Sequence, residues 1–481
     1  MESTKSSLPS DFLWSFATAA YQIEGAVNEN GRGPSIWDTF CKIPGKIAGC
    51  ASGDVACDSY HRTHKDIALL KACGAPAYRF SISWSRIVPL GGRNDPINEK
   101  GLQFYLKFVD NLLAAGITPM VTLFHWDLPK ELQKRYGGFL NKEEFVADFA
   151  HYARVVLKAF GSKVKYWITF NEPWCSIILG CNTGSFAPGR TSDRTKNPVG
   201  DGSTEPWIVG HSLLVAHGAA VKIYREEFKV QDGGEICITL NGDWAEPWDP
   251  ENPADIEACD LKIEFAISWF ADPIYLGKHP DCMMQQLGER LPATLEDIAL
   301  VHGSNDFYGM NHYCANYIRA KMGPPEPTDV TGNLELLLED KNGHSIGPVT
   351  QSPWLRPHAP GFRTLLKWLS DRYAFPKIYV TENGTSVLGE NDLPLDRLLD
   401  YEFRVQYFRD YIGAMADAYT MDGVNVRAYM AWSLMDNFEW AEGYETRFSV
   451  TYVDYENDQK RIPKKSAKAI GQIFDALIEK K

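Results

Sequence analysis

The amino-acid sequence predicts an α/β fold, a (β/α)8 TIM barrel with long insertions in the loops that follow the strands. Two observations carry this prediction: eight short runs rich in Val, Ile, Phe and Tyr recur along the 481 residues, and helix-like segments separate them. Most of the runs are apolar on both faces, which is typical of parallel strands buried between helices. A doubly wound open sheet is the alternative architecture.

The predicted strands end in polar residues, glycine or proline. In chain order they are residues 12–19, 77–83, 117–125, 164–171, 235–241, 306–313, 377–382 and 426–434. The helix-like segments are residues 59–73, 99–115, 142–160, 206–228, 256–268, 361–373 and 400–422. Pro206 opens the fourth of these helices, and Asp400 is a candidate N-cap for the last.

Long insertions follow from the length of the chain. A bare barrel needs about 250 residues, and this chain has 481. The predicted insertions are residues 89–98, 186–204, 241–255 and 322–357. We expect them to wall a deep pocket, because the loops after the strands carry the sites of such barrels. Since no shift in composition divides the chain, a single barrel domain over residues 1–481 is predicted.

The charge of the chain argues against nucleic acid as a partner. Its 49 basic and 62 acidic side chains give a formal charge of -13, and no run of Lys or Arg is long enough to follow a phosphate backbone. The N-terminal MESTKSSLPSDFLWS lacks the apolar core of a secretory signal, and no stretch is apolar enough to span a membrane. A cytoplasmic protein without a membrane partner is predicted.

The cysteines suggest neither a disulfide framework nor a metal site. Ten are scattered along the chain without a C-x-x-C pair or a Cys/His cluster at zinc spacing, so reduced thiols and no bound metal or cofactor are expected. The only N-x-[ST] sequon, at residues 383–385, adjoins a candidate active-site residue, where a glycan could not fit.

Chemically versatile side chains recur at or near the ends of the predicted strands. They are Gln22, Arg79, His125, Trp126, Asn171, Glu172, Asn241, Asn311, Tyr313, Glu382, Trp432, Glu439 and Trp440. In a parallel barrel all strand ends of one kind meet on one face, so these residues are predicted to share a pocket. Two carboxylates beside amides and aromatic rings suit glycoside hydrolysis, because sugars present hydroxyls to polar groups and C–H faces to rings.

Seven motifs carry a resemblance to a known family. They are FLWSFATAAYQIEG (12–25), YRFSISWSRI (78–87), LFHWDLP (123–129), TFNEP (169–173), DFYGMNHY (306–313), YVTENG (379–384) and AWSLMDNFEWAEGY (431–444). The chain resembles glycoside hydrolase family 1, the retaining β-glucosidases, over essentially its whole length, and is most similar to the intracellular fungal members.

The resemblance implies a role for each candidate residue. Glu172 is implied as the acid/base and Glu382 as the nucleophile, with Arg79 and Tyr313 in contact with Glu382. Further implied substrate-binding residues are Gln22, His125, Trp126, Asn171, Glu439 and Trp440, with Trp432 as the floor under the sugar ring. Asn241 is implied as a polar neighbour of the acid/base, and Trp174 with Leu179 as the lining of the aglycone entrance.

A retaining reaction constrains the two carboxyl groups. They must lie about 5 to 5.5 Å apart, so that one can attack while the other acts as acid and then as base. Arg79 and Tyr313 should keep Glu382 ionised, whereas burial and the neighbouring anion should raise the pKa of Glu172. Pro173 predicts extended backbone geometry at Glu172.

Other interpretations stay open at this stage. His125, Trp432 and Trp440 could be core residues, Gln22 and Asn311 strand-end caps, and Arg79 a partner of structural carboxylates. Rival functions are a 6-phospho-β-glucosidase, disfavoured by Glu439 and Glu442, a myrosinase-like enzyme, which would lack the acid, and a non-catalytic sugar-binding barrel. Transglycosylation is possible through the same intermediate. Aglycone preference, the choice among glucose, galactose and fucose, and the oligomeric state are left open.

Overall fold

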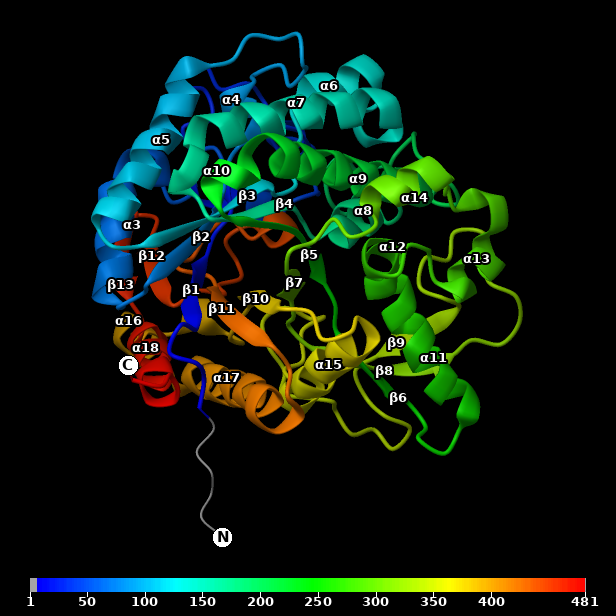
Figure 1. The fold of residues 1–481 in the computed structure, drawn as a ribbon. Coiled ribbons are helices and arrows are strands. Elements are labelled where there is room, and N and C mark those ends of the chain that lie inside the picture. Colours follow the sequence, from blue (N-terminus) through cyan, green and yellow to red (C-terminus); the bar gives the residue numbers. More distant parts are fainter. Residues whose placement is uncertain (1–6, 481) are drawn as a thin grey trace.

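Eight parallel strands close into a barrel in the computed structural model, which describes residues 7–480 (Figure 1). The barrel strands are β1 (Leu13–Ala17), β2 (Ala77–Ser81), β3 (Thr118–Phe124), β4 (Tyr166–Asn171), β5 (Glu235–Asn241), β7 (Tyr308–Asn311), β10 (Ile378–Asn383) and β11 (Val426–Trp432). Around the barrel they run β1-β11-β10-β7-β5-β4-β3-β2. All eight predicted strands are present, and closure rules out the open sheet.

Helices surround this barrel. The predicted ones are present as α3 (Ser59–Ala72), α5 (Glu99–Ala114), α7 (Lys142–Phe160), α9 (Glu205–Ile223), α11 (Pro253–Ile263), α15 (Ala359–Arg372) and α17 (Glu402–Asp422). The other α-helices are α1 (Ala20–Ile23), α2 (Ile36–Phe40), α4 (Trp84–Ile87), α6 (Lys130–Tyr136), α8 (Pro173–Cys181), α10 (Lys229–Asp232), α12 (Trp269–Tyr275), α13 (Asp281–Leu287), α14 (Leu295–Val301), α16 (Leu395–Leu399) and α18 (Lys465–Leu477). Within residues 7–480, no helix is both long enough and apolar enough to cross a membrane.

One predicted helix cap is wrong. Helix α17 begins after Tyr401, so Asp400 does not cap it. The reason is that residues 395–399 form the short helix α16, and Asp400 ends that helix instead. Its carboxylate pairs with Lys465 at 3.3 Å. Pro206 does lie in the first turn of α9, where the missing N–H costs no helical hydrogen bond.

The barrel strands separate two hydrophobic clusters because successive side chains point to opposite faces. In β11, Met430 and Trp432 belong to the cluster inside the barrel. Their neighbours Tyr429 and Ala431 belong to the larger cluster between barrel and helices. Burial on both faces explains why the strands read as continuous apolar runs in the sequence.

Pairing is irregular where two strands approach the site. The register of β10 shifts against β7 between Val380 and Glu382, and the register of β4 shifts against β5 between Ile168 and Asn171. Such irregularities bend a strand and re-aim its side chains, and they are common next to active sites. They affect the ends of β4 and β10, where the two candidate carboxylates lie.

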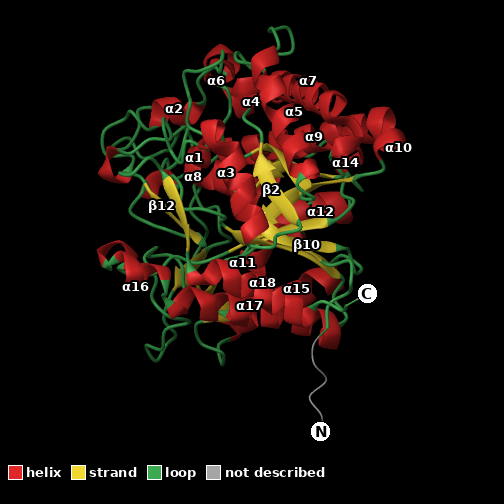
Figure 2. Ribbon diagram, turned by 90° about the vertical axis from the view of Figure 1, so that its left-hand side faces the viewer, coloured by secondary structure: helices red, strands yellow, loops and turns green. Residues whose placement is uncertain are grey.

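The insertions lie at one end of the barrel. Figure 2 shows many of the loops gathered on its left-hand side with α2, β12 and α16, which follow β1, β11 and β10 in the chain. Two of the predicted insertions contain strands that the sequence did not predict, β6 (Trp244–Pro247) and β9 (Leu334–Leu337). With β8 (Ala315–Ala320) they form a small sheet beside the barrel. A hairpin of β12 (Thr451–Asp454) and β13 (Lys460–Pro463) follows the last barrel strand.

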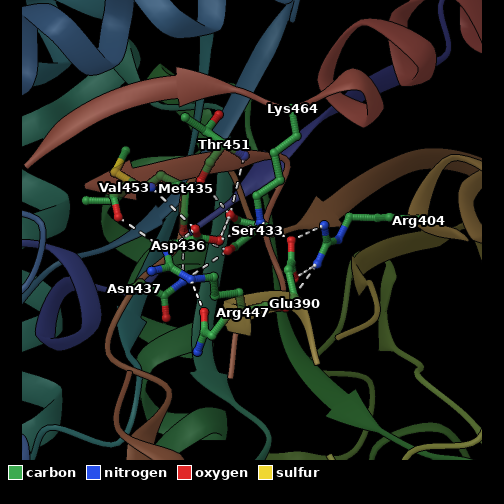
Figure 3. A network of polar contacts seen from close by, with 12 residues as sticks. Glu390, Arg404, Ser433, Met435, Asp436, Asn437, Arg447, Thr451, Val453 and Lys464 are labelled. Atoms are coloured by element: carbon green, nitrogen blue, oxygen red, sulfur yellow. Dashed lines mark hydrogen bonds and ion pairs between the residues drawn. The ribbon is translucent and has the colours of Figure 1, made fainter. Parts of the chain in front are cut away.

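A buried charge network ties the loop after β11 to the C-terminal segment (Figure 3). Lys464 is 3% exposed, and its Nζ lies 3.0 Å from Asp436 Oδ1 and 2.8 Å from Glu390 Oε1. Arg404 also pairs with Glu390 and Arg447 with Asp436, at 2.6 and 2.5 Å. Each charge therefore has a partner of opposite sign, as burial demands.

Replacing Lys464 by Met should destabilise the fold strongly, because Asp436 and Glu390 would each lose a buried cation. We expect a loss of about 3–5 kcal/mol in the free energy of unfolding, measured by chemical denaturation followed by tryptophan fluorescence. The matched control is Lys465→Met, since Lys465 is its exposed neighbour and pairs with Asp400 and Glu402 at the surface. That control should cost less than about 1 kcal/mol. Equal losses for the two variants would contradict a special role for the network.

Candidate active site

Glu382 lies near the carboxyl end of β10 and is 3% exposed. Arg79 Nη1 donates to Glu382 Oε1 at 2.5 Å, and the Tyr313 hydroxyl donates to Oε2 at 2.7 Å. Arg79 comes from β2 and is itself 1% exposed. Both carboxylate oxygens are therefore held by donors, and the adjacent cation favours the ionised form.

Glu172 is the residue between β4 and α8, and its backbone is left-handed, with φ 46° and ψ 68°. The prediction of extended geometry before Pro173 is therefore wrong. The N–H of Glu172 still pairs with the Thr239 carbonyl of β5 at 2.9 Å, while α8 begins at the next residue. The chain thus has to turn from strand to helix at one position. Such a conformation costs on the order of 1–3 kcal/mol, and it aims the carboxyl group into the barrel mouth.

Asn311 lies beside both carboxyl groups. Its Nδ2 donates to Glu172 Oε1 at 2.6 Å and to Asn171 Oδ1 at 3.1 Å, and the same amide acts to lower the pKa of Glu382. The Thr381 hydroxyl donates to Asn311 Oδ1 at 2.7 Å, which fixes the orientation of the amide. The amide in contact with Glu172 is that of Asn311, and Asn241, which the resemblance implies as a polar neighbour of the acid/base, pairs with Asn311 along the β5–β7 ladder.

The side chain of Asn171 links Arg79 to His125. Its Oδ1 accepts from Arg79 Nη2 at 2.6 Å, so its NH2 group faces His125 Nε2 at 3.1 Å. Nε2 must then be the acceptor, and the neutral ring carries its proton on Nδ1. Burial, together with the charge of Arg79, lowers the pKa of His125 well below its ordinary value. Nδ1 is buried and has no hydrogen-bond partner among the described residues.

Aromatic rings line the mouth beside this network. The His125 ring lies nearly parallel to Trp432 and to Trp440, with centroids 5.8 and 6.1 Å apart. Trp126 packs against Trp440 at 4.6 Å, and its Nε1 donates to the Asn171 carbonyl at 2.9 Å. A flat apolar surface therefore adjoins the carboxyl groups, which suits the C–H face of a sugar ring.

Gln22 and Glu439 are brought to the same mouth by short segments after β1 and β11. Gln22 lies in α1, fully buried, and donates to the Phe438 carbonyl at 2.9 Å. Glu439 is partly exposed. Burial and then the nearby Glu442 raise the pKa of Glu439 well above its ordinary value.

Asn241 and Trp174 lie to one side of these residues. Both line a cavity of about 80 Å³ together with Lys262 and Phe265, and Asn241 Oδ1 has no hydrogen-bond partner within the described part of the chain. Asn241 pairs with Asn311 in the β5–β7 ladder, which places the cavity beside the residues that contact Glu172. The structure therefore separates a central cluster around the two carboxyl groups from a side cavity.

The sequence matches the model of glycosyl hydrolase family 1 over residues 4–479. It is 55% identical to beta-glucosidase 1B of Phanerodontia chrysosporium over 472 residues, which cover 98% of this chain and 86% of that protein. The crystal structure of a GH1 beta-glucosidase from Humicola insolens in complex with glucose is 71% identical, with a TM-score of 0.98, and the match covers 99% of this chain and 100% of that one. The beta-glucosidase from Trichoderma harzianum is 61% identical, with a TM-score of 0.96 and full coverage of both chains.

This chain belongs to glycosyl hydrolase family 1. The predicted resemblance and the barrel fold are both confirmed.

The two carboxyl groups of this family 1 chain have different environments. Burial, and then the charge of Glu382, raises the pKa of Glu172 to about 8. Burial also raises the pKa of Glu382, but Arg79 and the Tyr313 hydroxyl act against that shift. Glu172 is contacted by an amide rather than a cation. Near neutral pH the proton therefore resides on Glu172 and the charge on Glu382.

The sequon residue Asn383 is buried behind Glu382 in this family 1 site, as predicted. Its Nδ2 donates to the His312 carbonyl at 2.6 Å and to the Tyr407 hydroxyl at 2.9 Å, so both N–H bonds are used. Gly384 follows, and a side chain there would come within 2.0 Å of the Trp432 carbonyl oxygen. Close contact between β10 and β11 therefore requires glycine at this position.

The sequence predicts Asn311 in the pocket but gives it no role, with a strand-end cap as the alternative, and it does not single out Asn437. Both buried amides lie within the family motifs. These amides matter because they hydrogen-bond side chains from other segments, and the periodicity of the sequence does not predict such contacts. A polar residue at the buried end of an apolar strand was the one available sign of Asn311.

We expect kcat/KM for aryl glucosides to fall as the pH rises through about 8, because a general acid at Glu172 would then have lost its proton. Glu382→Gln should lower the pKa of Glu172 toward the ordinary value, since the neighbouring negative charge is gone. Carbon-13 NMR of the labelled Glu172 carboxyl group measures its pKa in the wild-type protein and in Glu382→Gln. A Glu172→Gln sample assigns the signal. An unchanged Glu172 pKa in Glu382→Gln would show that burial alone sets it.

Proposed function

We propose that the protein is a retaining β-glucosidase in which Glu382 is the nucleophile and Glu172 the acid/base, acting as one catalytic unit over the whole chain. The substrates proposed are terminal non-reducing β-D-glucosyl residues of cellobiose, short cello-oligosaccharides and aryl β-glucosides. β-Glucosidase activity is supported by the family and by relatives at 55% and 71% identity. The observation that carries the two roles is the contrast between Glu382, which is paired with Arg79, and Glu172, which is contacted by the Asn311 amide.

The first step breaks the glycosidic bond. The ionised Glu382 carboxylate attacks the anomeric carbon, while the protonated Glu172 gives its proton to the leaving oxygen. Asn311 donates to Glu172 and acts on the pKa of Glu382, and the charge of Glu382 acts on the pKa of Glu172. This proximity favours the short separation of a covalent mechanism over the wider one that holds a water between the carboxyl groups. The product of this step is a glycosyl ester of Glu382 and the free aglycone.

The second step returns the enzyme to its starting state. Glu172, now a carboxylate, takes a proton from a water that attacks the anomeric carbon, and the ester bond to Glu382 breaks. The sugar leaves with the configuration that it had in the substrate. Because Arg79 and Tyr313 contact the two oxygens of Glu382, they are placed to stabilise the carboxylate as it departs.

The sugar is proposed to lie on Trp432, with its hydroxyls bound by polar side chains around it. Those side chains are Gln22, His125, Asn171 and Glu439, with Trp440 and Trp126 completing the wall. Support comes from Gln22 Oε1 and His125 Nδ1, which are buried, have no hydrogen-bond partner within residues 7–480 and can therefore bind hydroxyls. Asn171 is held by Arg79 and is proposed to bind the hydroxyl next to the anomeric carbon.

The aglycone is proposed to leave past Trp174 and Leu179, near the cavity that Asn241 lines. A second sugar bound there would present its hydroxyl to the glycosyl ester, so transglycosylation is proposed as a side reaction. A 6-phosphorylated sugar is disfavoured as substrate, because a phosphate is bound by cations, whereas the loop after β11 brings two carboxyl groups together, those of Glu439 and Glu442.

A reducing compartment, the cytoplasm, is proposed as the place of action. All ten cysteines are unpaired, and Cys57, Cys181, Cys237 and Cys314 are almost completely buried. Free thiols are typical of proteins that work under reducing conditions. Cell fractionation with an antibody tests this, and recovery of the enzyme only from the culture medium would contradict it.

Glu382→Ala should lose several orders of magnitude in aryl β-glucoside hydrolysis, because no covalent intermediate can form. Azide or formate should restore part of the rate by attacking from the vacated side, and the product should then have the α configuration. Proton NMR measures both the rate of product formation and the configuration of the product. Wild-type enzyme is the control and should release β-glucose first, whereas full activity in the variant would sink the assignment.

Glu172→Ala should separate substrates by their leaving groups. Hydrolysis of cellobiose, whose leaving group needs a proton, should fall roughly 10²–10⁴-fold, while 2,4-dinitrophenyl β-glucoside should lose far less in the glycosylation step. Steady-state and pre-steady-state kinetics on the two substrates provide the comparison. Equal losses on both would contradict the acid role.

A further inference from the structure

Two buried side-chain amides, those of Gln22 and Asn437, form a hydrogen-bonded chain behind the sugar-facing surface. Gln22 Nε2 donates to Asn437 Oδ1 at 3.0 Å and to the Phe438 carbonyl at 2.9 Å. Asn437 Nδ2 donates to Ser433 Oγ and to the Met435 carbonyl, both at 3.0 Å. The exposed fractions of Gln22 and Asn437 are 0% and 5%. Their contacts are therefore made in the absence of bulk water.

Backbone carbonyls determine which way both amides point. A carbonyl oxygen can only accept, so the group of Asn437 that faces Met435 must be its NH2 group, and its Oδ1 must face Gln22. The Phe438 carbonyl fixes the Gln22 NH2 group in the same way. Both N–H bonds of Gln22 are then used inside the protein. Its Oε1 is buried without a hydrogen-bond partner among the described residues.

We propose that Asn437 is a positioning residue for sugar recognition, which holds the Gln22 amide so that only its carbonyl oxygen is offered to the substrate. The inference rests on the proposed function, in which Gln22 binds the sugar. A hydroxyl that meets Gln22 must then act as a hydrogen-bond donor. Asn437 itself does not touch the sugar and acts through Gln22.

The buried charge network supplies the support for this arrangement (Figure 3). Asp436 lies between Met435 and Asn437, and its carboxylate is held by Lys464 at 3.0 Å and by Arg447 at 2.5 Å. The N–H of Asp436 also donates to the Thr451 carbonyl at 2.9 Å. The backbone on both sides of Asp436 is thereby fixed, which places the Met435 carbonyl and the Asn437 side chain where Gln22 needs them.

A double-mutant cycle tests whether Asn437 acts through Gln22. Asn437→Ala should raise KM for 4-nitrophenyl β-glucoside about 2- to 10-fold, the effect of one neutral hydrogen bond, with kcat within about twofold of wild type. In a Gln22→Ala background the same substitution should leave KM unchanged, because the group that it positions is gone. Asn457→Ala, in the exposed β12–β13 turn, is the control and should change neither constant.

Sugar analogues supply a readout that a merely structural role would not move. The probes are 4-nitrophenyl β-glucosides that lack the hydroxyl at C3, C4 or C6. The hydroxyl bound by Gln22 is the one whose removal costs less in Gln22→Ala than in wild type. Asn437→Ala should reduce the cost at that same position and leave the costs at the other two positions unchanged.

Ser433→Ala is a second, milder variant that tests the same proposal even where Asn437→Ala folds poorly. It removes one of the two acceptors that orient Asn437 and deletes a single oxygen atom, so a smaller change of the same pattern is expected. Melting temperatures of all variants are compared. An equal rise in KM on both Gln22 backgrounds, or a uniform change over the three deoxy sugars, would overturn the proposal. Unaltered kinetics in Gln22→Ala alone would overturn it together with the sugar-binding role of Gln22, while Glu382 and Glu172 would keep their roles.

Discussion

The buried ion pair between Arg79 and Glu382 is the interaction on which the rest of the site depends. Arg79 also donates to the Thr381 carbonyl at 2.9 Å and to Asn171 Oδ1 at 2.6 Å, so one guanidinium joins β2, β4 and β10. Its own backbone carbonyl accepts from Thr18 at the seam where β1 and β2 close the barrel. A buried cation without an anion would be costly, and for that reason the fold and the ionised state of Glu382 support each other.

That arrangement decides how the other polar groups must behave. With the negative charge fixed on Glu382, a second charge on Glu172 is unfavourable, and Glu172 retains its proton. With Arg79 bound to the oxygen of Asn171, only the NH2 group of Asn171 is left for His125. The ion pair therefore determines, through the Asn171 amide, which atoms around the two carboxyl groups donate and which accept hydrogen bonds.

Backbone geometry around the site is costly and is held in place by its surroundings. Trp126, Glu172 and Trp440 all have positive φ angles, of 75°, 46° and 49°, in the segments that leave β3, β4 and β11. Each such residue costs on the order of 1–3 kcal/mol. The packed aromatic rings hold Trp126 and Trp440, while the network around Asp436 holds the loop that carries Trp440. The packed rings and the charge network around Asp436 therefore keep these strained residues in one orientation.

The sequence by itself determined the eight strands, seven of the helices, the two carboxylates and most of the residues around them. It did so because both signals are local: burial on two faces makes a strand continuously apolar, and a polar residue such as Glu172 or Glu382 stands out at the end of one. Only the tertiary structure decided the left-handed turn at Glu172, the small sheet in the insertions, and the places of Asn311 and Asn437. Each of these depends on contacts between segments far apart in the chain, such as Gln22 with Asn437. A pattern along the sequence carries no record of such distances, because they are set only when the barrel closes.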